Sequence, residues 1–287
     1  MKSSCSERNS YSFSAALNSV IGILPTFFFN QYMNFVTATP SLICAMRSFS
    51  TSTGFFVALG RSVRFSSSRI RVSAGILLTR RLLTFFLHTG GHYKEGTTDI
   101  TRTVVMGPTT EEEKKYFTAV LRGTLNLGAA RFLHGCTGVN LDILARQPLW
   151  EMGEDFKHGT GHGVGYLLNV HEGPNSFRWK IVPGGNAVLE EGMITSDEPG
   201  YYREDGFGIR HENLMVCKKA EKTEYGQFMC FEFLTMVPFD LDGVVPELMS
   251  VRERNLLNDY HAQVYEKISP YLNEEEKEWL KDATRAI

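Results

Sequence analysis

The chain has 287 residues, of which 43% are hydrophobic, so it is long enough to bury a sizeable core in one large domain or two smaller ones. Its formal net charge is −2, and basic residues do not cluster on any predicted helix beyond the first part of the chain, which argues against nucleic-acid binding. The five cysteines are widely spaced and never form a CxxC pair, which predicts reduced thiols and a cytoplasmic protein rather than a disulfide-held secreted one.

Residues 1–87 differ in composition from the rest of the chain. They contain one acidic residue, Glu7, against nine Lys and Arg, and they show no sustained helical or alternating period. A transit peptide is also rich in Arg and Ser and poor in acids, but one of this length with so many aromatic residues would be unusual. The apolar stretch Val20–Phe29 contains Pro25 and is too short to span a bilayer, so no membrane association is expected. We favour a segment foreign to the rest of the chain, such as an out-of-frame translation joined to a genuine coding region, with little ordered structure.

From residue 88 onward the pattern indicates short strands and helices. A β-branched run predicts a strand around Asp99, and Thr109 or Thr110 can cap a helix whose first turn is acidic. A second helix is expected over residues 139–149, disturbed near its end by Pro148. Further strands are predicted over residues 164–170, 192–195, 209–217 and 228–237, and further helices after Ser250 and Asn273.

The most unusual stretch is Phe156–Pro174, which reads FKHGTGHGVGYLLNVHEGP and holds three histidines among five glycines. Glycine lets a backbone approach a ligand closely, and histidine is both a metal ligand and an acid or base near neutral pH. No packing requirement calls for this composition. A glycine-rich turn with incidental surface histidines is the alternative, and the carboxylates on either side of the stretch favour a functional site.

Three acidic residues accompany predicted strands on either side of this stretch. Asp99 lies inside a strand, and Glu198 and Glu212 each lie at the end or edge of an apolar segment. With His162 they make three carboxylates and one imidazole, a set that suits Mn²⁺, Co²⁺ or Zn²⁺, whereas a closed structural zinc site would require thiolates. Glu232, in a later aromatic-rich strand, is as consistent with an edge charge as with a ligand.

Five motifs occur in the order EGTTDITRT, HGTGHGVG, NVHEGP, DEPGYY and FGIRHEN. In this order they resemble the aminopeptidase P group of the pita-bread metallopeptidases, over about residues 88–287. The resemblance implies an α+β pita-bread (creatinase/aminopeptidase) fold, in which pseudo-twofold α/β halves surround a curved antiparallel sheet. It divides the chain into the atypical residues 1–87, a partial catalytic domain over 88–237 and a C-terminal extension over 238–287, with the N-terminal part of the fold incomplete.

The resemblance implies a metal-dependent Xaa-Pro aminopeptidase, which releases the N-terminal residue from peptides with proline in the second position. Two divalent metal ions, usually Mn²⁺, with Zn²⁺ or Co²⁺ as alternatives, would be held by Asp99, His162, Glu198 and Glu212. Asp99 and Glu212 would bridge the ions. Glu198 would also act as the base, and His158 and His171 would be the catalytic residues on the substrate side. Peptides are thus the expected partners, a homodimer is left open, and neither nucleic acid nor a membrane is expected.

One position departs from the family pattern. In Leu87-His88-Thr89-Gly90-Gly91, His88 stands eleven residues before Asp99, where the family has a fifth metal ligand, an aspartate. An imidazole binds the same metals, but the site would lose a unit of negative charge. Two alternatives therefore stay open, a catalytically impaired or inactive truncated pita-bread protein and a prolidase-like dipeptidase. The GHGVG spacing and the long C-terminal extension favour the aminopeptidase over the prolidase.

Overall fold

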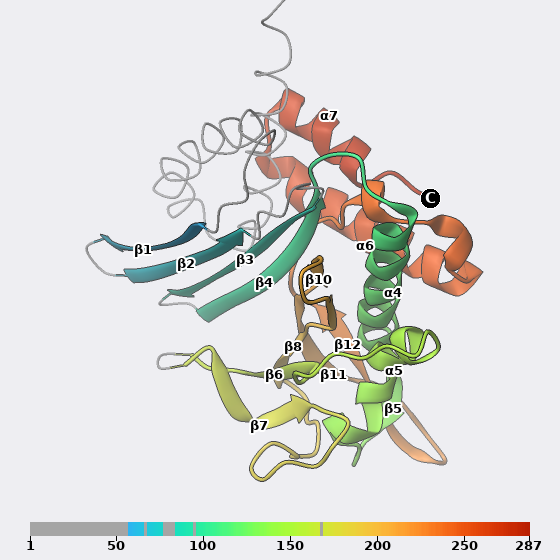
Figure 1. Ribbon diagram of the computed structural model, residues 1–287. Coiled ribbons are helices and arrows are strands. Elements are labelled where there is room, and N and C mark those ends of the chain that lie inside the picture. The colour runs from blue at the N-terminus through green and yellow to red at the C-terminus, as the bar shows by residue number, and fades with distance from the viewer. Residues whose placement is uncertain (1–56, 66–67, 77–83, 94–95, 167–168) are drawn as a thin grey trace, which may run out of the picture.

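The computed structural model describes residues 57–65, 68–76, 84–93, 96–166 and 169–287. Within this part of the chain the strands form antiparallel sheets with helices beside them, which confirms the expected α+β class (Figure 1). Each helix among these residues is too short or too polar to cross a bilayer. The expectations for residues 1–56, including the one for Val20–Phe29, lie outside the described residues.

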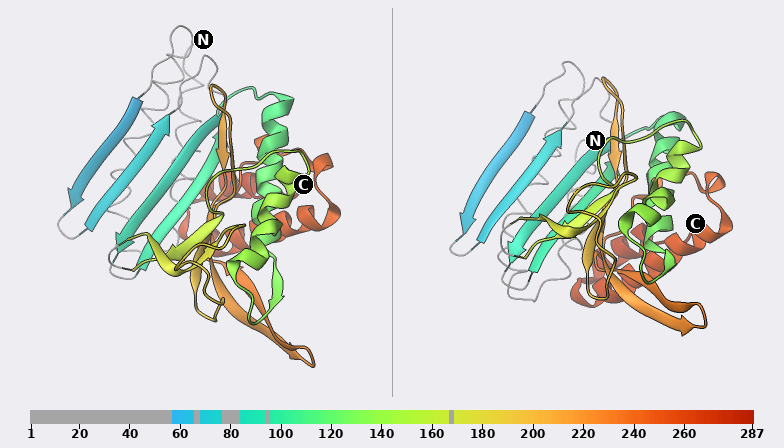
Figure 2. Two further views of the ribbon diagram at one scale, coloured as in Figure 1. Left: turned by 60° about the horizontal axis from the view of Figure 1, so that its bottom comes forward. Right: turned by 90° about the horizontal axis from the view of Figure 1, so that it is seen from below.

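A four-stranded antiparallel sheet comes first, in the order β1-β2-β3-β4 (Figure 2). Its strands are β1 (Val57–Phe65), β2 (Ser68–Ile76), β3 (Thr84–Tyr93) and β4 (Gly96–Val105). β3 and β4 pair along their whole length, from Thr84 opposite Val105 to Tyr93 opposite Gly96. The proposed boundary at residue 87 thus falls inside β3, and two described strands lie on its N-terminal side; the division of the chain into domains stays a prediction.

A six-stranded antiparallel sheet follows, in the order β5-β12-β11-β8-β6-β7. Its strands are β5 (Arg131–Leu133), β6 (Gly161–Val164), β7 (His171–Phe177), β8 (Ile194–Asp197), β11 (Asn213–Thr223) and β12 (Gly226–Phe233). The short strands β9 (Gly200–Tyr202) and β10 (Gly208–Arg210) pair with each other. An isolated bridge between Thr101 and Glu212 connects β4 to the segment between β10 and β11, which brings the two larger sheets together.

The helices begin where the sequence predicts them. They are α4 (Glu111–Gly128), α5 (Gly138–Trp150), α6 (Val251–Ile268) and α7 (Glu274–Ala283), with short 3-10 turns at Leu241–Gly243, Pro246–Leu248 and Ser269–Tyr271. Capping boxes at Thr110, Ser250 and Asn273 satisfy the free N–H groups of α4, α6 and α7. Pro148 lies inside α5, which ends two residues later at Trp150.

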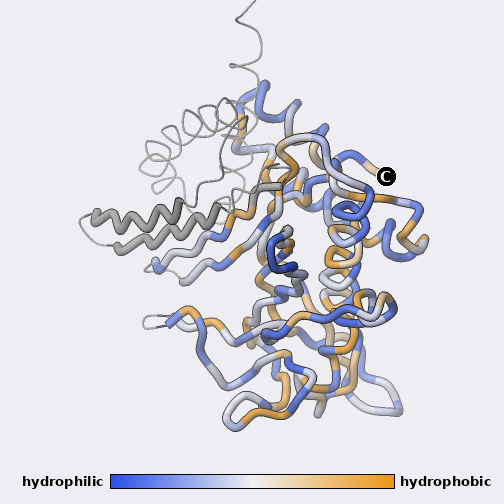
Figure 3. The backbone as a smooth tube through the Cα atoms, viewed as in Figure 1, coloured by the Kyte–Doolittle hydropathy of each residue, from blue (hydrophilic) through white to orange (hydrophobic). Residues whose placement is uncertain are grey.

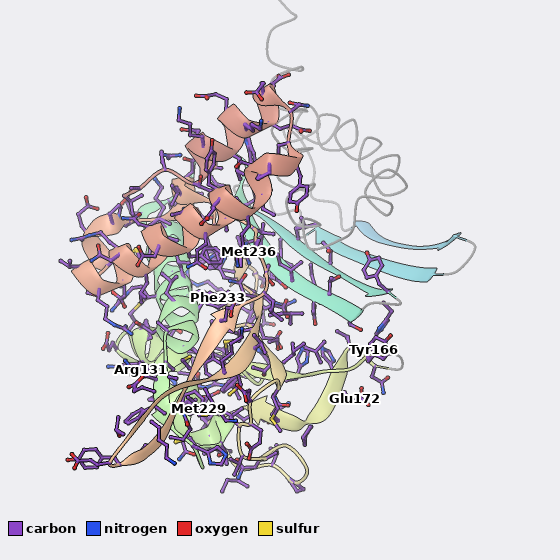
Figure 4. All side chains as sticks on the ribbon, turned by 180° about the vertical axis from the view of Figure 1, so that it is seen from behind. Arg131, Tyr166, Glu172, Met229, Phe233 and Met236 are labelled. Carbon is purple, nitrogen blue, oxygen red and sulfur yellow. The ribbon has the colours of Figure 1, made fainter. Side chains whose placement is uncertain are left out.

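Two groups of buried side chains form the core. The first packs α4 against α6 and includes Phe117, Leu121 and Leu257. The second lies beside α5 and the six-stranded sheet, and Phe233 packs against both groups. Figure 4 shows Phe233 and Met236 between β12 and the C-terminal helices. The outer turns of these helices are hydrophilic in Figure 3, so their apolar face is turned toward the core.

A buried arginine fixes β4 against the segment that follows β10. The guanidinium of Arg102 donates to the Glu212 carbonyl at 2.7 Å, to Asn213 Oδ1 at 2.6 Å and to the Val237 carbonyl at 2.8 Å. It also lies over the Phe239 ring, 4.1 Å from the centroid. Because a guanidinium offers five donors in a rigid fork, this one side chain sets the position of Asp99's strand relative to Glu212.

All four strands predicted beyond residue 163 differ from the structure in their bounds. Residues 192–195 and 228–237 overlap β8 and β12, which span Ile194–Asp197 and Gly226–Phe233, and the other two predicted strands are not single strands. Residues 164–170 do not form one strand, because β6 ends at Val164 and β7 begins at His171, so the two make a hairpin. A Cβ at Gly165 would overlap the Asn169 carbonyl, so the missing side chain permits this tight reversal. Residues 209–217 are divided between β10 and β11, because the Glu212 N–H bonds to the Thr101 carbonyl on β4 at 2.9 Å.

Candidate metal centre

Five residues singled out in the sequence lie on or beside strands of the two larger sheets. They are His88 on β3, Asp99 on β4, His162 on β6, Glu198 directly after β8 and Glu212 between β10 and β11. Three overlapping sets each bring one nitrogen or oxygen atom per residue within 4.8 Å of one another: Asp99, His162 and His171; His88, Asp99 and Glu212; His162, Glu198 and Glu212. The structure therefore brings these side chains together from positions as far apart as 88 and 212.

The distances within the cluster are those of groups that share a small space. His88 Nε2 lies 3.0 Å from Asp99 Oδ1, and His162 Nε2 lies 3.6 Å from Asp99 Oδ2 and 3.3 Å from Glu198 Oε1. Asp99 and Glu212 are almost fully buried, whereas His88 retains 38% of its side-chain exposure. His88 thus lies in the cluster as a partly exposed imidazole beside a buried carboxylate.

The carboxylates destabilise one another's charge. Burial, and then the neighbouring Glu212, raise the pKa of Glu198 to about 9. Burial, and then Asp99, raise the pKa of Glu212 to about 7. A buried divalent cation would reverse this repulsion, because opposite charge within a few ångströms favours the ionised carboxylate. The charge pattern of the cluster is that of a cation site.

The unsatisfied atoms of the cluster test the fit to a metal. The His162 ring bonds through Nδ1–H to the Gly163 carbonyl at 3.0 Å, which leaves the Nε2 lone pair facing the carboxylates. Within the described residues, His162 Nε2 and Glu212 Oε1 are buried and have no hydrogen-bond partner. Buried polar atoms are rarely left unpaired. An imidazole nitrogen and carboxylate oxygens aimed at one point are a donor set that fits Mn²⁺, Co²⁺ or Zn²⁺.

Hydroxyl groups that the sequence analysis did not single out orient these side chains. Ser196 Oγ accepts the His162 backbone N–H at 3.0 Å and donates to Glu198 Oε1 at 3.2 Å, so one hydroxyl connects β6 to the Glu198 carboxyl. Thr101 Oγ1 donates to Glu212 Oε2 at 2.5 Å and accepts from Arg210 Nε at 3.0 Å. The contacts of Thr101 with Glu212 and of Ser196 with His162 join strands that are distant in sequence, so these two roles have no sequence signal.

Two further histidines lie beside the cluster. The rings of His162 and His171 are 4.1 Å apart, and His171 is exposed at the start of β7. The His158 ring donates from Nδ1 to the Gly159 carbonyl at 2.8 Å, and its Nε2 accepts from the Tyr202 hydroxyl at 3.0 Å. Burial lowers the pKa of His158, so this imidazole is neutral near pH 7.

The glycines of the Phe156–Pro174 stretch have a steric reason. A Cβ at Gly161 would overlap the Ser196 carbonyl, and one at Gly163 would overlap the Glu172 carbonyl. The two missing side chains let β6 lie close to β7 and to β8. Figure 4 shows Tyr166 and Glu172 on the hairpin that this packing forms. Glu232, by contrast, pairs with Lys218 at 2.7 Å and is a charge on the surface of the sheet, away from the cluster.

Comparison with known proteins shows which proteins the chain is similar to. The model of metallopeptidase family M24 matches residues 79–219, and that of the C-terminal region of peptidase M24 matches residues 227–287. A probable Xaa-Pro aminopeptidase P of Arthroderma otae is 45% identical over 212 residues, which are 71% of this chain and 33% of the relative. An aminopeptidase P1 of Arabidopsis thaliana is 42% identical over 207 residues, which are 71% of this chain and 32% of the relative.

Among solved structures, an X-prolyl aminopeptidase of Caenorhabditis elegans is similar to the chain. It is described as a cytosolic enzyme with a di-nuclear active site. It is 30% identical, with a TM-score of 0.71, over 98% of this chain and 47% of that one. The chain spans about a third of the length of the two curated relatives.

Proposed function

Because the chain belongs to metallopeptidase family M24 and has the pita-bread fold of that family, we propose that it is a metal-dependent aminopeptidase that releases the N-terminal residue from peptides with proline in second position. Relatives named Xaa-Pro aminopeptidase P and aminopeptidase P1 support this substrate class. The match of residues 227–287 to the C-terminal region of the family supports the aminopeptidase over a prolidase-like dipeptidase.

One observation carries the proposal: the buried, unpartnered atoms His162 Nε2 and Glu212 Oε1 face a cluster of mutually repelling carboxylates. Two divalent ions would be held by Asp99, His162, Glu198 and Glu212, with His88 as a further ligand. Among these residues, Asp99 and Glu212 are the almost fully buried carboxylates. Mn²⁺ is proposed, with Zn²⁺ and Co²⁺ as alternatives, because the set combines carboxylates with imidazole and has no thiolate.

The proposed chemistry is hydrolysis of the bond to proline. When bound, the two ions would bring the pKa of a water molecule close to neutrality. Glu198 would take the proton of that water and pass it to the departing proline nitrogen. The carboxyl suits this role, since it is 14% exposed and its Oε1 is oriented by the Ser196 hydroxyl.

The neighbouring histidines would bind the substrate. A bond to proline has no N–H, so recognition must use the proline ring, the free N-terminal amine and the scissile carbonyl. His171, exposed beside His162, would donate to the carbonyl oxygen as negative charge develops there. His158 would contact the N-terminal part of the substrate, with its ring already fixed by Gly159 and Tyr202.

The proposal also covers the location of the protein in the cell and its oligomeric state. Cys136, Cys217 and Cys230 carry free thiols, which supports a cytoplasmic location. A homodimer stays open, and sedimentation equilibrium of the purified chain would decide it.

The test is hydrolysis by the purified chain loaded with Mn²⁺, Co²⁺ or Zn²⁺. We expect a tripeptide with proline in second position to lose its first residue, and the Xaa-Pro dipeptide to be cleaved more slowly. A chain that binds metal but cleaves neither peptide would favour the second candidate, an inactive pita-bread protein. The specific observation behind that candidate is His88, an imidazole 3.0 Å from Asp99 Oδ1 at the position where the family has an aspartate.

A further inference from the structure

A buried ion pair on α5 lies behind the candidate metal centre. Arg146 Nε donates to Asp142 Oδ2 at 2.6 Å, and the two side chains are 1% and 0% exposed. Removing a guanidinium and a carboxylate from water costs desolvation free energy, so a buried ion pair by itself adds little to the stability of the folded state. The contribution of this ion pair to the structure must therefore come from the other hydrogen bonds that Asp142 and Arg146 make.

The pair holds the segment that leads into β6. Arg146 Nη1 donates to Asp155 Oδ1 at 2.7 Å and to the Phe156 carbonyl at 2.8 Å, and Nη2 donates to the His158 carbonyl at 2.9 Å. The guanidinium also lies 3.9 Å from the centroid of the Phe156 ring. Residues 155, 156 and 158 are thereby all hydrogen-bonded to the one rigid, planar guanidinium of Arg146.

Thr160 connects the ion pair to the candidate metal ligands through hydrogen bonds. Its hydroxyl donates to Asp142 Oδ1 at 2.5 Å, and its backbone N–H bonds to the Phe177 carbonyl on β7 at 2.9 Å. Its carbonyl accepts the backbone N–H of Glu198 at 2.7 Å. Thr160 is thus hydrogen-bonded to the backbone of one candidate ligand, Glu198, and lies two residues before another, His162.

We propose that Asp142, Arg146 and Thr160 form a positioning unit for the metal centre, which sets the relative placement of Glu198, His162 and the substrate-side His158. This inference rests on the proposed function. The three residues touch neither the metal nor the substrate in this scheme, and they act through the backbone of residues 156–162. Neighbours of this kind usually change metal affinity when altered, even though they are not ligands.

Two matched pairs of variants test the proposal. Thr160→Val removes the hydroxyl and Thr160→Ser retains it. Arg146→Lys keeps one positive charge but loses the fork, and Arg122→Lys makes the same change where Arg122 on α4 pairs with Glu253 on α6, at 2.9 Å. Mn²⁺ affinity is measured by calorimetry, and the visible absorption of bound Co²⁺ reports the ligand geometry. Thermal unfolding in EDTA identifies any variant that fails to fold.

We expect Thr160→Val and Arg146→Lys to bind Mn²⁺ roughly 10- to 100-fold more weakly than wild type and to change the Co²⁺ spectrum. Thr160→Ser and Arg122→Lys should keep both the affinity and the spectrum. Unchanged binding in Thr160→Val and Arg146→Lys would overturn the proposal, as would equal weakening in all four variants. A wild-type chain that binds Mn²⁺ but cleaves no peptide would contradict only the proposed function, and one that binds neither ion would overturn both.

Discussion

The buried histidine on α6 contributes to the acid sensitivity of the fold, and one substitution should remove that contribution. His261 Nε2 accepts the Phe239 backbone N–H at 3.1 Å, so a proton added to that nitrogen would meet another donor. Burial, and then the charges of Arg102 and Arg285, lower the pKa of His261 from 6.5 to about 3. The folded state therefore holds the imidazole neutral, while the unfolded state takes up a proton below pH 6.5.

The sign and size of the effect come from this difference. The stability that depends on neutral His261 is fully present above pH 6.5 and is lost as the pH falls toward 3, because only the unfolded chain gains the proton. Between pH 7.5 and 5.5 the loss is about 1.4 kcal/mol, one tenfold change in the unfolding equilibrium. The side chain is 0% exposed, so solvent screening should not diminish it.

His261→Gln tests this assignment, since the Gln carbonyl can accept the Phe239 N–H but does not titrate in this range. Urea unfolding in EDTA at pH 7.5 and pH 5.5 gives the free energy of unfolding for wild type and variant. We expect the wild type to lose about 1.4 kcal/mol more than the variant between the two pH values. The exposed His134, changed to Gln, serves as the control. If His261→Gln loses as much stability as the wild type, His261 is not the acid-sensitive group.

Three other predictions concern the metal centre. His88→Asp should bind Mn²⁺ more tightly than wild type in calorimetry, because a carboxylate restores the negative charge that the imidazole lacks; equal affinity would contradict this argument from charge. Glu198→Gln should lower kcat at least about 100-fold, as expected for a lost general base, and near-normal turnover would assign the base elsewhere. Gly161→Ala should lower the free energy of unfolding by about 3 kcal/mol or more and abolish metal binding, since its Cβ would overlap the Ser196 carbonyl. Gly208→Ala, whose Cβ would meet only the Tyr202 ring at 3.3 Å, is the control for urea unfolding.

What could be predicted from the sequence was local. The helices that begin after Thr110, Ser250 and Asn273 were predictable because a capping box is a pattern of four consecutive residues. The residues now found in the cluster were also recognisable, since several histidines in one short stretch and acids beside strands have few packing explanations. The glycines of that stretch, by contrast, are explained by packing, which was not expected from the sequence. The resemblance added the assignment of roles, which spacing alone does not provide.

What could not be predicted depends on contacts between distant strands. Thr101 and Ser196 look like ordinary strand residues in the sequence. Only the pairing of β4 with Glu212, and of β6 with β8, places the Thr101 hydroxyl on the Glu212 carboxylate and the Ser196 hydroxyl on the His162 backbone N–H. The hairpin of β6 and β7 was missed because glycine is unfavourable in a strand interior and lowers the strand signal around His162. The same glycines are what allow the strands to approach so closely.

The bridge between Thr101 and Glu212 has a consequence for how the chain acquires its site. The two residues are 111 positions apart, so their contact closes a long loop before it contributes any stabilising energy. Glu212 is also the last of the clustered residues to be synthesised. A nascent chain therefore carries an incomplete set of ligands until Glu212 has left the ribosome and β11 has paired with β8. Metal capture should accordingly be a late event in folding, coming after the non-local strand pairing rather than guiding it.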